Sequence, residues 1–228
     1  MKFINVVPAR KSSRGLKNKN LTLINKLKLI EYTFKEIAKG KLKKTFILSD
    51  DNKIKKIALK YNLLTDYKRP KKLSLDRTSI TDTLYDFVKW HLKKHGNFEY
   101  LVLLQPTSPL RKFKDIKKAT EIVNKNKYDS LFSISESLEH PYESIDIKNF
   151  KKGKWRHLFP KAIKYYRRQD FDINSYFING AIYIIKKELI LKKKIYNYNN
   201  HGFYIMPKSR SLDINGKEEI ILAKKLLK

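Results

Sequence analysis

Cysteine is absent from the 228-residue sequence, and glycine and proline are scarce, with seven residues of each. The lack of cysteine excludes disulfides, thiol nucleophiles and cysteine-based zinc sites. No apolar run reaches the length of about 18 residues that a membrane span needs, so no span is expected. The apolar stretch 3–7 is too short for a signal peptide and predicts a first strand instead. Together these absences predict a cytoplasmic protein.

Positive charge dominates the composition. The chain has 52 lysine and arginine residues against 22 aspartate and glutamate residues, for a formal net charge of +30. Such a charge is typical of proteins that neutralise nucleic-acid phosphates. The lysines are spread along the whole chain, however, and the other abundant residues are those that AT-rich codons specify. Coding bias and an electrostatic role, such as attraction of an anionic substrate, both explain the charge, which therefore does not identify the function.

Apolar runs alternate with amphipathic stretches, and 41% hydrophobic residues suffice for a sizeable core. The apolar runs predict strands at 3–7, 45–48, 100–104, 130–134, 176–185 and 203–206. Helical spacing of apolar residues predicts helices at 27–38, 54–61, 79–95, 116–123 and 216–227. This alternation predicts a three-layer, Rossmann-like α/β fold with a mostly parallel twisted sheet.

The pattern breaks at about 136–174, where polar and aromatic residues replace the alternation of strands and helices. We interpret this stretch as a small lobe inserted into a single domain that spans residues 1–228. Ligands of doubly wound sheets bind at the carboxyl ends of strands, and the unusual loops of this chain follow strands.

The loop at 8–20 follows the first predicted strand and carries five cations: Arg10, Lys11, Arg14, Lys17 and Lys19. It lacks both the Gly-Lys-Ser/Thr ending of a Walker loop and the glycine spacing of a dinucleotide-binding loop. Five positive charges repel one another unless a polyanion or solvent compensates them. The pattern is compatible with a phosphate-binding site and with an ordinary solvated basic loop.

At this loop the chain begins to resemble the cytidylyltransferases that activate sialic-acid-like sugars, including the legionaminic and pseudaminic acid branches. The family loop contains Pro-Ala-Arg, then Gly-Gly-Ser-Lys-Gly, then Lys-Asn; Arg10, Ser13, Gly15, Lys19 and Asn20 match it. The resemblance extends nearly to the carboxyl terminus. It implies that Arg10, Ser13 and Asn20 bind the nucleotide and that Arg10 and Lys19 take part in catalysis at its phosphates.

Two further segments resemble the same family. Arg69-Pro70, followed by Asp76, is similar to a segment that implies nucleotide binding by Arg69 and Asp76. The stretch 103–111, Leu-Leu-Gln-Pro-Thr-Ser-Pro-Leu-Arg, is the closest match in the chain and implies a sugar-binding role for three residues: Gln105, Thr107 and Ser108. An amide at a strand end can bind a sugar hydroxyl, and the prolines hold it there. A proline turn that only caps a strand is the alternative.

Arg168-Gln169-Asp170 and Asn179-Gly180 also resemble the family, and the resemblance implies that Arg168 and Asn179 face the acidic sugar. The planar fork of an arginine suits a carboxylate. Without the resemblance, Arg168 is equally compatible with a surface cation.

The segment 211–215, Ser-Leu-Asp-Ile-Asn, resembles the closing Asp-Ile-Asp of the family, which implies magnesium at Asp213 and Asn215, with Asp213 catalytic. Asn215 stands where a second aspartate is usual, but its neutral oxygen can also bind a hard cation. Glu219, one helical turn beyond, is a second candidate to complete the site. Taken alone, one aspartate at a strand end is weak evidence for a metal.

Of the five histidines, only His91 and His95 have the i, i+4 spacing of a metal-ligand pair. They lie near the end of a predicted helix. We favour a surface or helix-terminal role for both over a zinc site.

We predict an enzyme that transfers CMP from CTP to the anomeric hydroxyl of a nonulosonic acid, an acidic nine-carbon sugar, with Mg²⁺ as cofactor. Two alternatives remain: CMP activation of a 3-deoxy-octulosonic acid and a basic nucleic-acid-binding module. The expected partners are CTP and the sugar, without nucleic acid or membrane. We also predict a homodimer, because the lobe has more aromatic residues than it can bury by itself: Tyr142, Phe150, Trp155, Phe159, Tyr165, Tyr166 and Phe171.

Overall fold

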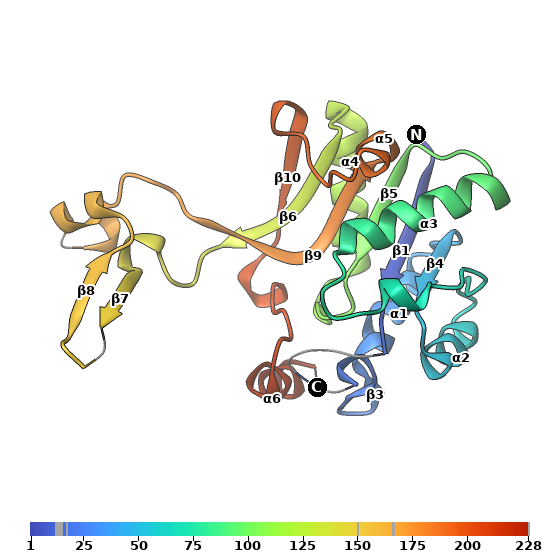
Figure 1. The fold of residues 1–228 in the computed structure, drawn as a ribbon, viewed down its shortest axis with the longest axis horizontal. Coiled ribbons are helices and arrows are strands. Elements are labelled where there is room, and N and C mark those ends of the chain that lie inside the picture. Colours follow the sequence, from blue (N-terminus) through green and yellow to red (C-terminus); the bar gives the residue numbers. More distant parts are fainter. Residues whose placement is uncertain (12–15, 17, 150, 166, 228) are drawn as a thin grey trace.

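A computed structural model describes the whole chain except residues 12–15, 17, 150, 166 and 228. Its centre is a six-stranded sheet with the strand order β10-β6-β9-β5-β1-β4 (Figure 1). The six strands are β1 (Phe3–Pro8), β4 (Thr45–Leu48), β5 (Tyr100–Leu104), β6 (Ser130–Glu136), β9 (Tyr176–Lys186) and β10 (His201–Ile205). β9 runs antiparallel to both of its neighbours, and every other pair in this sheet is parallel.

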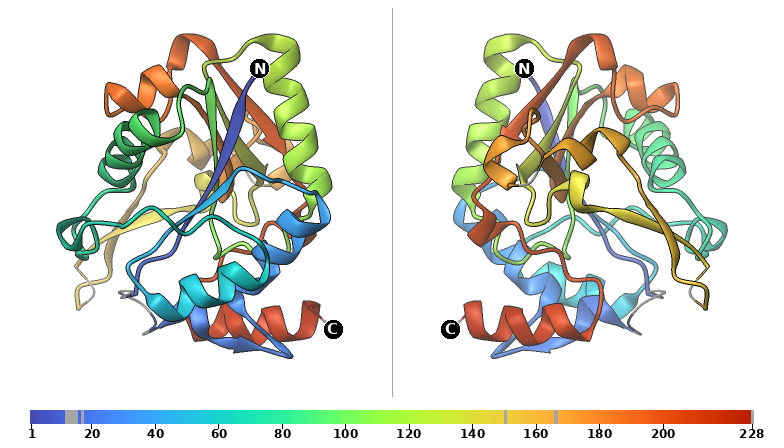
Figure 2. Two further views of the ribbon diagram at one scale, coloured as in Figure 1. Left: turned by 90° about the vertical axis from the view of Figure 1, so that its right-hand side faces the viewer. Right: turned by 90° about the vertical axis from the view of Figure 1, so that its left-hand side faces the viewer.

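Helices cover both faces of the sheet (Figure 2). One apolar core joins the sheet to α1 (Leu29–Lys39), α2 (Asn52–Lys60) and α4 (Phe113–Asn126). A second core joins the opposite face to α3 (Ile80–Lys94) and α5 (Lys187–Leu191). The fold is therefore the predicted three-layer α/β arrangement with a mostly parallel sheet.

Each predicted strand and helix is present, with boundaries that shift by a few residues. Most apolar side chains of the inner strands are buried, as the periodicity indicated; Ile4, Val6 and Val7 of β1 have no exposed surface. Phe177 at the start of β9 and Phe203 of β10 are exposed instead. Three features were not predicted: the short hairpin of β2 (Leu23–Ile24) and β3 (Leu27–Lys28), helix α5, and the pair of strands at 145–149 and 154–157. None of the helices in the described part of the chain is long and apolar enough to cross a membrane.

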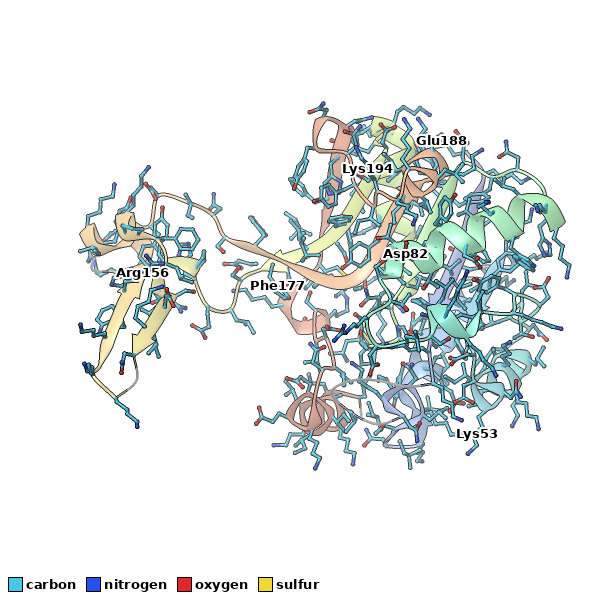
Figure 3. All side chains as sticks on the ribbon, viewed as in Figure 1. Lys53, Asp82, Arg156, Phe177, Glu188 and Lys194 are labelled. Carbon is cyan, nitrogen blue, oxygen red and sulfur yellow. The ribbon has the colours of Figure 1, made fainter. Side chains whose placement is uncertain are left out.

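Residues 137–175 leave the sheet between β6 and β9 and form a lobe that projects from it (Figure 1). The lobe contains its own two-stranded antiparallel sheet, β7 (Ile145–Asn149) and β8 (Lys154–His157), with short 3₁₀ helices. Figure 3 shows Arg156 on this lobe and Phe177 on the strand that connects it to the sheet. Below, "the lobe" means residues 137–175.

A third, small core holds the chain after β10. Ile214 packs with Ile24 and Leu29 and with Ala223 of α6 (Lys217–Leu226). Ile214 is fully buried, whereas its neighbour Asn215 is exposed. Anchoring of this apolar side chain therefore holds the flanking polar residues at the surface of the domain.

Candidate functional site

A pocket of about 480 Å³ lies where β1 and β5 end. Because these parallel strands point the same way, the loops that follow them meet at one edge of the sheet. The pocket is lined by Pro8, Arg10, Lys19, Asn20, Arg69, Thr78, Ile80, Gln105, Pro106, Thr107 and Asn215. Seven of these residues were predicted as site residues, from segments that are far apart in the sequence.

The loop after β1 gives the pocket its cationic side. Lys19 donates a hydrogen bond from Nζ to the carbonyl oxygen of Ile214, over 2.8 Å. Burial lowers the pKa of Lys19, and the nearby carboxylates of Asp213 and Glu219 oppose this shift. Asn20 is buried and donates from Nδ2 to the carbonyl oxygen of Arg10, over 3.4 Å. Arg10 and Lys19 thus bring two cationic side chains of this loop to the pocket, which suit a polyphosphate.

The guanidinium of Arg69 is directed into the protein. Its Nε and Nη2 donate to the carbonyl oxygen of Leu73, over 3.1 and 2.6 Å, and Nη1 donates to that of Leu48, over 3.3 Å. Nη2 also donates to the hydroxyl of Thr83, over 3.2 Å. Burial lowers the pKa of Arg69. Arg69 thus stabilises the segment that closes one side of the pocket.

Another wall of the pocket consists of Gln105, Pro106 and Thr107. The side chain of Gln105 lies against Gly180, where a Cβ atom would be 3.3 Å from Oε1 of Gln105. Gly180 has a φ of +72°, a conformation that side chains other than glycine rarely adopt. Ser108, predicted to bind sugar, is buried below this wall with 1% of its surface exposed. Its hydroxyl has no partner among the described residues.

Asp213 and Asn215 stand on either side of the buried Ile214. Nδ2 of Asn215 donates to Oδ2 of Asp213, over 3.1 Å. Oδ1 of Asp213 is buried and has no hydrogen-bond partner within the described part of the chain. Such an unsatisfied carboxylate oxygen fits a hard cation such as Mg²⁺. Glu219 instead accepts a hydrogen bond from the backbone amide of Gly216, over 2.7 Å, and so caps α6.

The described residues contain no cluster of three or more histidine, aspartate or glutamate side chains that could hold a metal ion. Among the described residues, Asp213 is thus the one carboxylate at this place with a buried oxygen free of hydrogen bonds. A cation that keeps water and takes substrate phosphate oxygens is compatible with so few protein ligands.

Asn179 is buried in the sheet. Its Oδ1 accepts from the Ser133 hydroxyl over 2.6 Å, and its Nδ2 donates to the Ser211 hydroxyl over 3.0 Å. It belongs to an irregular stretch of β9 opposite Ser133, where the pairing with β6 changes register. Asn179 thus ties this stretch to the segment that carries Asp213.

Arg168 lies in the lobe and lines a different pocket from Arg10 and Lys19. Its guanidinium donates to Glu143 and Glu139, and these hydrogen bonds raise its pKa. Within one chain, the structure does not bring Arg168 together with Gln105. Ser13 lies outside the described residues.

The pocket also contains residues that sequence reasoning missed, among them Thr78 and Ile80. Their segment follows Arg69-Pro70, but neither side chain type suggests a ligand. Arg111 was part of the recognised stretch 103–111 and received no role, although an arginine that follows an apolar turn was a usable signal.

Solved nucleotidyltransferases share this fold. A CMP:2-keto-3-deoxy-manno-octonic acid synthetase complexed with CTP superposes with a TM-score of 0.71 and 13% identity, covering 100% of this chain and 98% of that one. A 4-diphosphocytidyl-2C-methyl-D-erythritol synthase from Anaerococcus prevotii gives a TM-score of 0.66 and 15% identity, with 99% and 98% covered. At this identity the likeness concerns the fold alone.

Sequence similarity is more specific. A family model described as cytidylyltransferase matches residues 4–220, and the chain belongs to this family. An N-acylneuraminate cytidylyltransferase of Streptococcus agalactiae is 32% identical over 226 residues, which cover 97% of this chain and 52% of that protein. This chain thus spans about half the length of that relative. A CMP-N,N'-diacetyllegionaminic acid synthase of Campylobacter jejuni is 31% identical, with 92% and 88% covered.

Proposed function

We propose that this protein transfers CMP from CTP to the anomeric hydroxyl of a nonulosonic acid and releases pyrophosphate. The observation that carries the proposal is a pocket lined by both a cationic loop and a polar wall, in a chain of the cytidylyltransferase family. Arg10 and Lys19 lie on the cationic side, where a triphosphate would fit, and Gln105 and Thr107 lie on the side left for the sugar.

The reaction is an in-line displacement at the α-phosphorus of CTP. The anomeric oxygen forms a bond to phosphorus, the bond to the bridging oxygen breaks so that pyrophosphate leaves, and the hydroxyl proton passes to solvent water. Arg10 and Lys19 neutralise the charge that collects on the phosphate oxygens. Lys19 is held by Ile214, so its ammonium is oriented before the substrate binds. We assign no general base.

Magnesium is the cofactor that we propose, held by Asp213 with help from Asn215. The unsatisfied Oδ1 of Asp213 supports this assignment. When bound, Mg²⁺ would withdraw electrons from phosphate oxygens and orient the triphosphate.

The nine-carbon substrate class is supported by the relatives, since proteins about 30% identical to this chain are named for acylneuraminate and diacetyllegionaminic acid. The octulosonic alternative rests on a likeness of fold at 13% identity. The nucleic-acid-binding alternative has no support from the family. We expect the reaction in the cytoplasm, where CTP is available.

We further propose that the protein is a homodimer that forms through the lobe. The lobe has an aromatic cluster in which Tyr142 is buried against Tyr165 and Phe171. Trp155 and Phe159 remain 55% and 43% exposed. Phe150 and Tyr166 lie outside the described residues. An apolar surface of this kind on a projecting lobe is typical of an interface.

The deciding experiment is pyrophosphate release from CTP with a panel of purified nonulosonic and octulosonic acids. We expect turnover with at least one nonulosonic acid and slower turnover with the octulosonic acid. Thermal-shift titration with all four nucleoside triphosphates gives an independent measurement, and we expect the largest stabilisation with CTP. The proposal is contradicted if the folded protein releases no pyrophosphate with any sugar of the panel and is stabilised equally by ATP and CTP.

A further inference from the structure

Arg111 is buried at the base of the pocket wall. Only 1% of its surface is exposed, and it is the largest of the fully buried side chains among the described residues. Its Nη1 donates to the carbonyl oxygens of Gln105 and Ala181, over 2.9 and 2.7 Å. Its Nη2 donates to the Thr33 hydroxyl of α1, over 2.7 Å. One guanidinium thus joins the end of β5, the irregular stretch of β9 and a helix.

The charge of Arg111 has no carboxylate in contact within the described part of the chain. Asp115 is engaged by Arg210, over 3.1 and 2.6 Å. Glu36 accepts from the backbone amide of Phe113, over 2.7 Å, and pairs with Lys112. Burial without a contacting counter-ion is costly and lowers the pKa of Arg111 to about 10. The three hydrogen bonds of the guanidinium offset part of this cost, so its role lies in the groups that it binds and not in filling space.

The hydrogen bonds of Arg111 fix the backbone at two places beside the Gln105 side chain. The carbonyl of Gln105 lies directly before Pro106 and Thr107, which line the pocket. The carbonyl of Ala181 follows Gly180, the residue against which the Gln105 side chain lies. Arg111 therefore fixes the backbone position of Gln105 itself and of the strand segment against which the Gln105 side chain packs.

The loop at Gln105–Thr107 also contacts the segment that carries Asp213. The carbonyl oxygen of Thr107 accepts a hydrogen bond from the backbone amide of Ile214, over 2.8 Å. Ile214 lies between Asp213 and Asn215. A shift of the wall at Gln105 would therefore move the metal-binding candidates as well.

We propose that Arg111 is a positioning residue, which aligns the Gln105–Thr107 wall and, through the Thr107–Ile214 hydrogen bond, the Asp213 segment. This inference rests on the proposed function. Arg111 touches no substrate; its role is to fix the distance between the sugar side and the metal side of the pocket. A displacement of about 1 Å in such a framework can cost on the order of a hundredfold in rate.

The test compares four variants. Arg111→Lys keeps the charge but cannot donate to three acceptors with a planar fork. Thr33→Val removes one of the three acceptors of Arg111 and is the milder substitution. Thr33→Ser keeps the hydroxyl that accepts from Arg111. Thr45→Val is the matched control, because Thr45 is a buried threonine whose hydroxyl donates to Leu42, over 2.7 Å, at the opposite end of a strand from the pocket. Each variant is assayed for kcat, for the KM of sugar and of CTP, and for amide hydrogen exchange at Ile214.

For Arg111→Lys we expect kcat divided by the sugar KM to fall by on the order of a hundredfold. We expect faster exchange at Ile214, and a KM for CTP within about threefold of the wild type. Thr33→Val should show the same changes more weakly. Thr33→Ser should behave like the wild type, and Thr45→Val should lower only the Tm. The proposal is overturned if the exchange at Ile214 and the sugar KM stay unchanged in both Arg111→Lys and Thr33→Val.

The two proposals fail in different ways. A wild-type protein that releases no pyrophosphate contradicts the proposed function, whereas exchange at Ile214 still reports on Arg111. If Arg111→Lys does not fold, Thr33→Val carries the test, because it leaves the arginine in place.

Discussion

The guanidinium of Arg10 and the carboxylate of Asp76 form an ion pair, with 3.0 Å between Nη1 and Oδ1. The same Nη1 donates to the carbonyl oxygen of Leu75, over 2.9 Å. Both residues of the pair were predicted to bind nucleotide, but only Arg10 lines the pocket. Asp76 has 53% of its side chain exposed, so water weakens its attraction for Arg10. A triphosphate carries more negative charge than one carboxylate, so it should replace Asp76 as the ion-pair partner of Arg10.

This relationship predicts different results for the two residues. Arg10→Ala should raise the KM for CTP by about tenfold or more, because a charge-assisted hydrogen bond to phosphate is lost. Asp76→Asn should leave that KM within about threefold, because an exposed pair contributes little. Steady-state kinetics at saturating sugar measures both. An equal loss in the two variants would mean that Asp76 itself binds the nucleotide.

Asp213→Asn should lower kcat by about a hundredfold or more, since this carboxylate, hydrogen-bonded to the pocket residue Asn215, is the proposed ligand of the magnesium ion. The fold should persist, because Asp213 is only partly buried. Asn215→Asp should lower the magnesium concentration for half-maximal rate, because a second carboxylate strengthens the site. Magnesium titrations of the rate measure both effects.

Glu218→Gln is the control for these two variants, because Glu218 is an exposed carboxylate in the first turn of α6. Its substitution should leave the magnesium dependence unchanged. Near-normal magnesium-dependent activity of Asp213→Asn would show that the metal is held elsewhere.

The exposed apolar surface of the lobe predicts a dimer in solution. Sedimentation at micromolar concentration should give about twice the monomer mass of 27.1 kDa. Trp155→Asp should shift the protein to monomer, because an unpaired charge in an apolar interface is costly. Leu59→Asp is the matched control, since Leu59 on α2 is 57% exposed, similar to Trp155, and lies outside the lobe. A wild-type monomer would overturn this prediction.

His91 predicts a loss of stability in mild acid. His91 lies in the last turn of α3, which agrees with the expected helix-terminal role, but it is not at the surface. Its side chain is buried among Phe46, Phe87 and Phe98. Burial, with smaller contributions from His95, Lys2 and Lys44, lowers the pKa of His91 to about 4. Between about pH 6.5 and 4, the unfolded chain therefore binds a proton that the folded chain excludes. The free energy of unfolding should fall as the pH decreases through this window.

Urea unfolding at several pH values between 7.5 and 4.5 measures this effect. His91→Leu should reduce the slope of the free energy of unfolding against pH. Part of the slope should remain, because burial also lowers the pKa of His201. Phe98→Leu, a core substitution beside His91, should lower stability at every pH and keep the wild-type slope. An unchanged slope in His91→Leu would exclude His91 as its source.

The order of strands and helices was predictable because each element carries its own apolar periodicity. The direction of β9 was not, since residues 176–186 are apolar in a way that suits a buried strand of either direction. The hairpin at Leu23–Lys28 has only two residues in each strand, too few for a periodic pattern.

The residues around the pocket were found mainly through the segments that contain them, but their contacts were not. Arg69 and Asn179 are polar groups in recognised segments, yet their donors and acceptors are used by the protein itself. Whether a polar group faces a ligand or the backbone depends on side-chain direction, which spacing in the sequence does not determine. Arg168 illustrates the same limit, because the lobe carries it away from Gln105.

The position of β9 constrains how the chain can fold during synthesis. β9 lies between β5 and β6, although both of these strands precede it and the whole lobe separates β6 from it. Until residue 186 has left the ribosome, the inner edges of β5 and β6 have no common neighbour, and each presents unpaired backbone groups. Such edges are sites of aggregation and chaperone binding. The nascent protein thus passes through a stage with a divided sheet, and its central strand is among the last to be added.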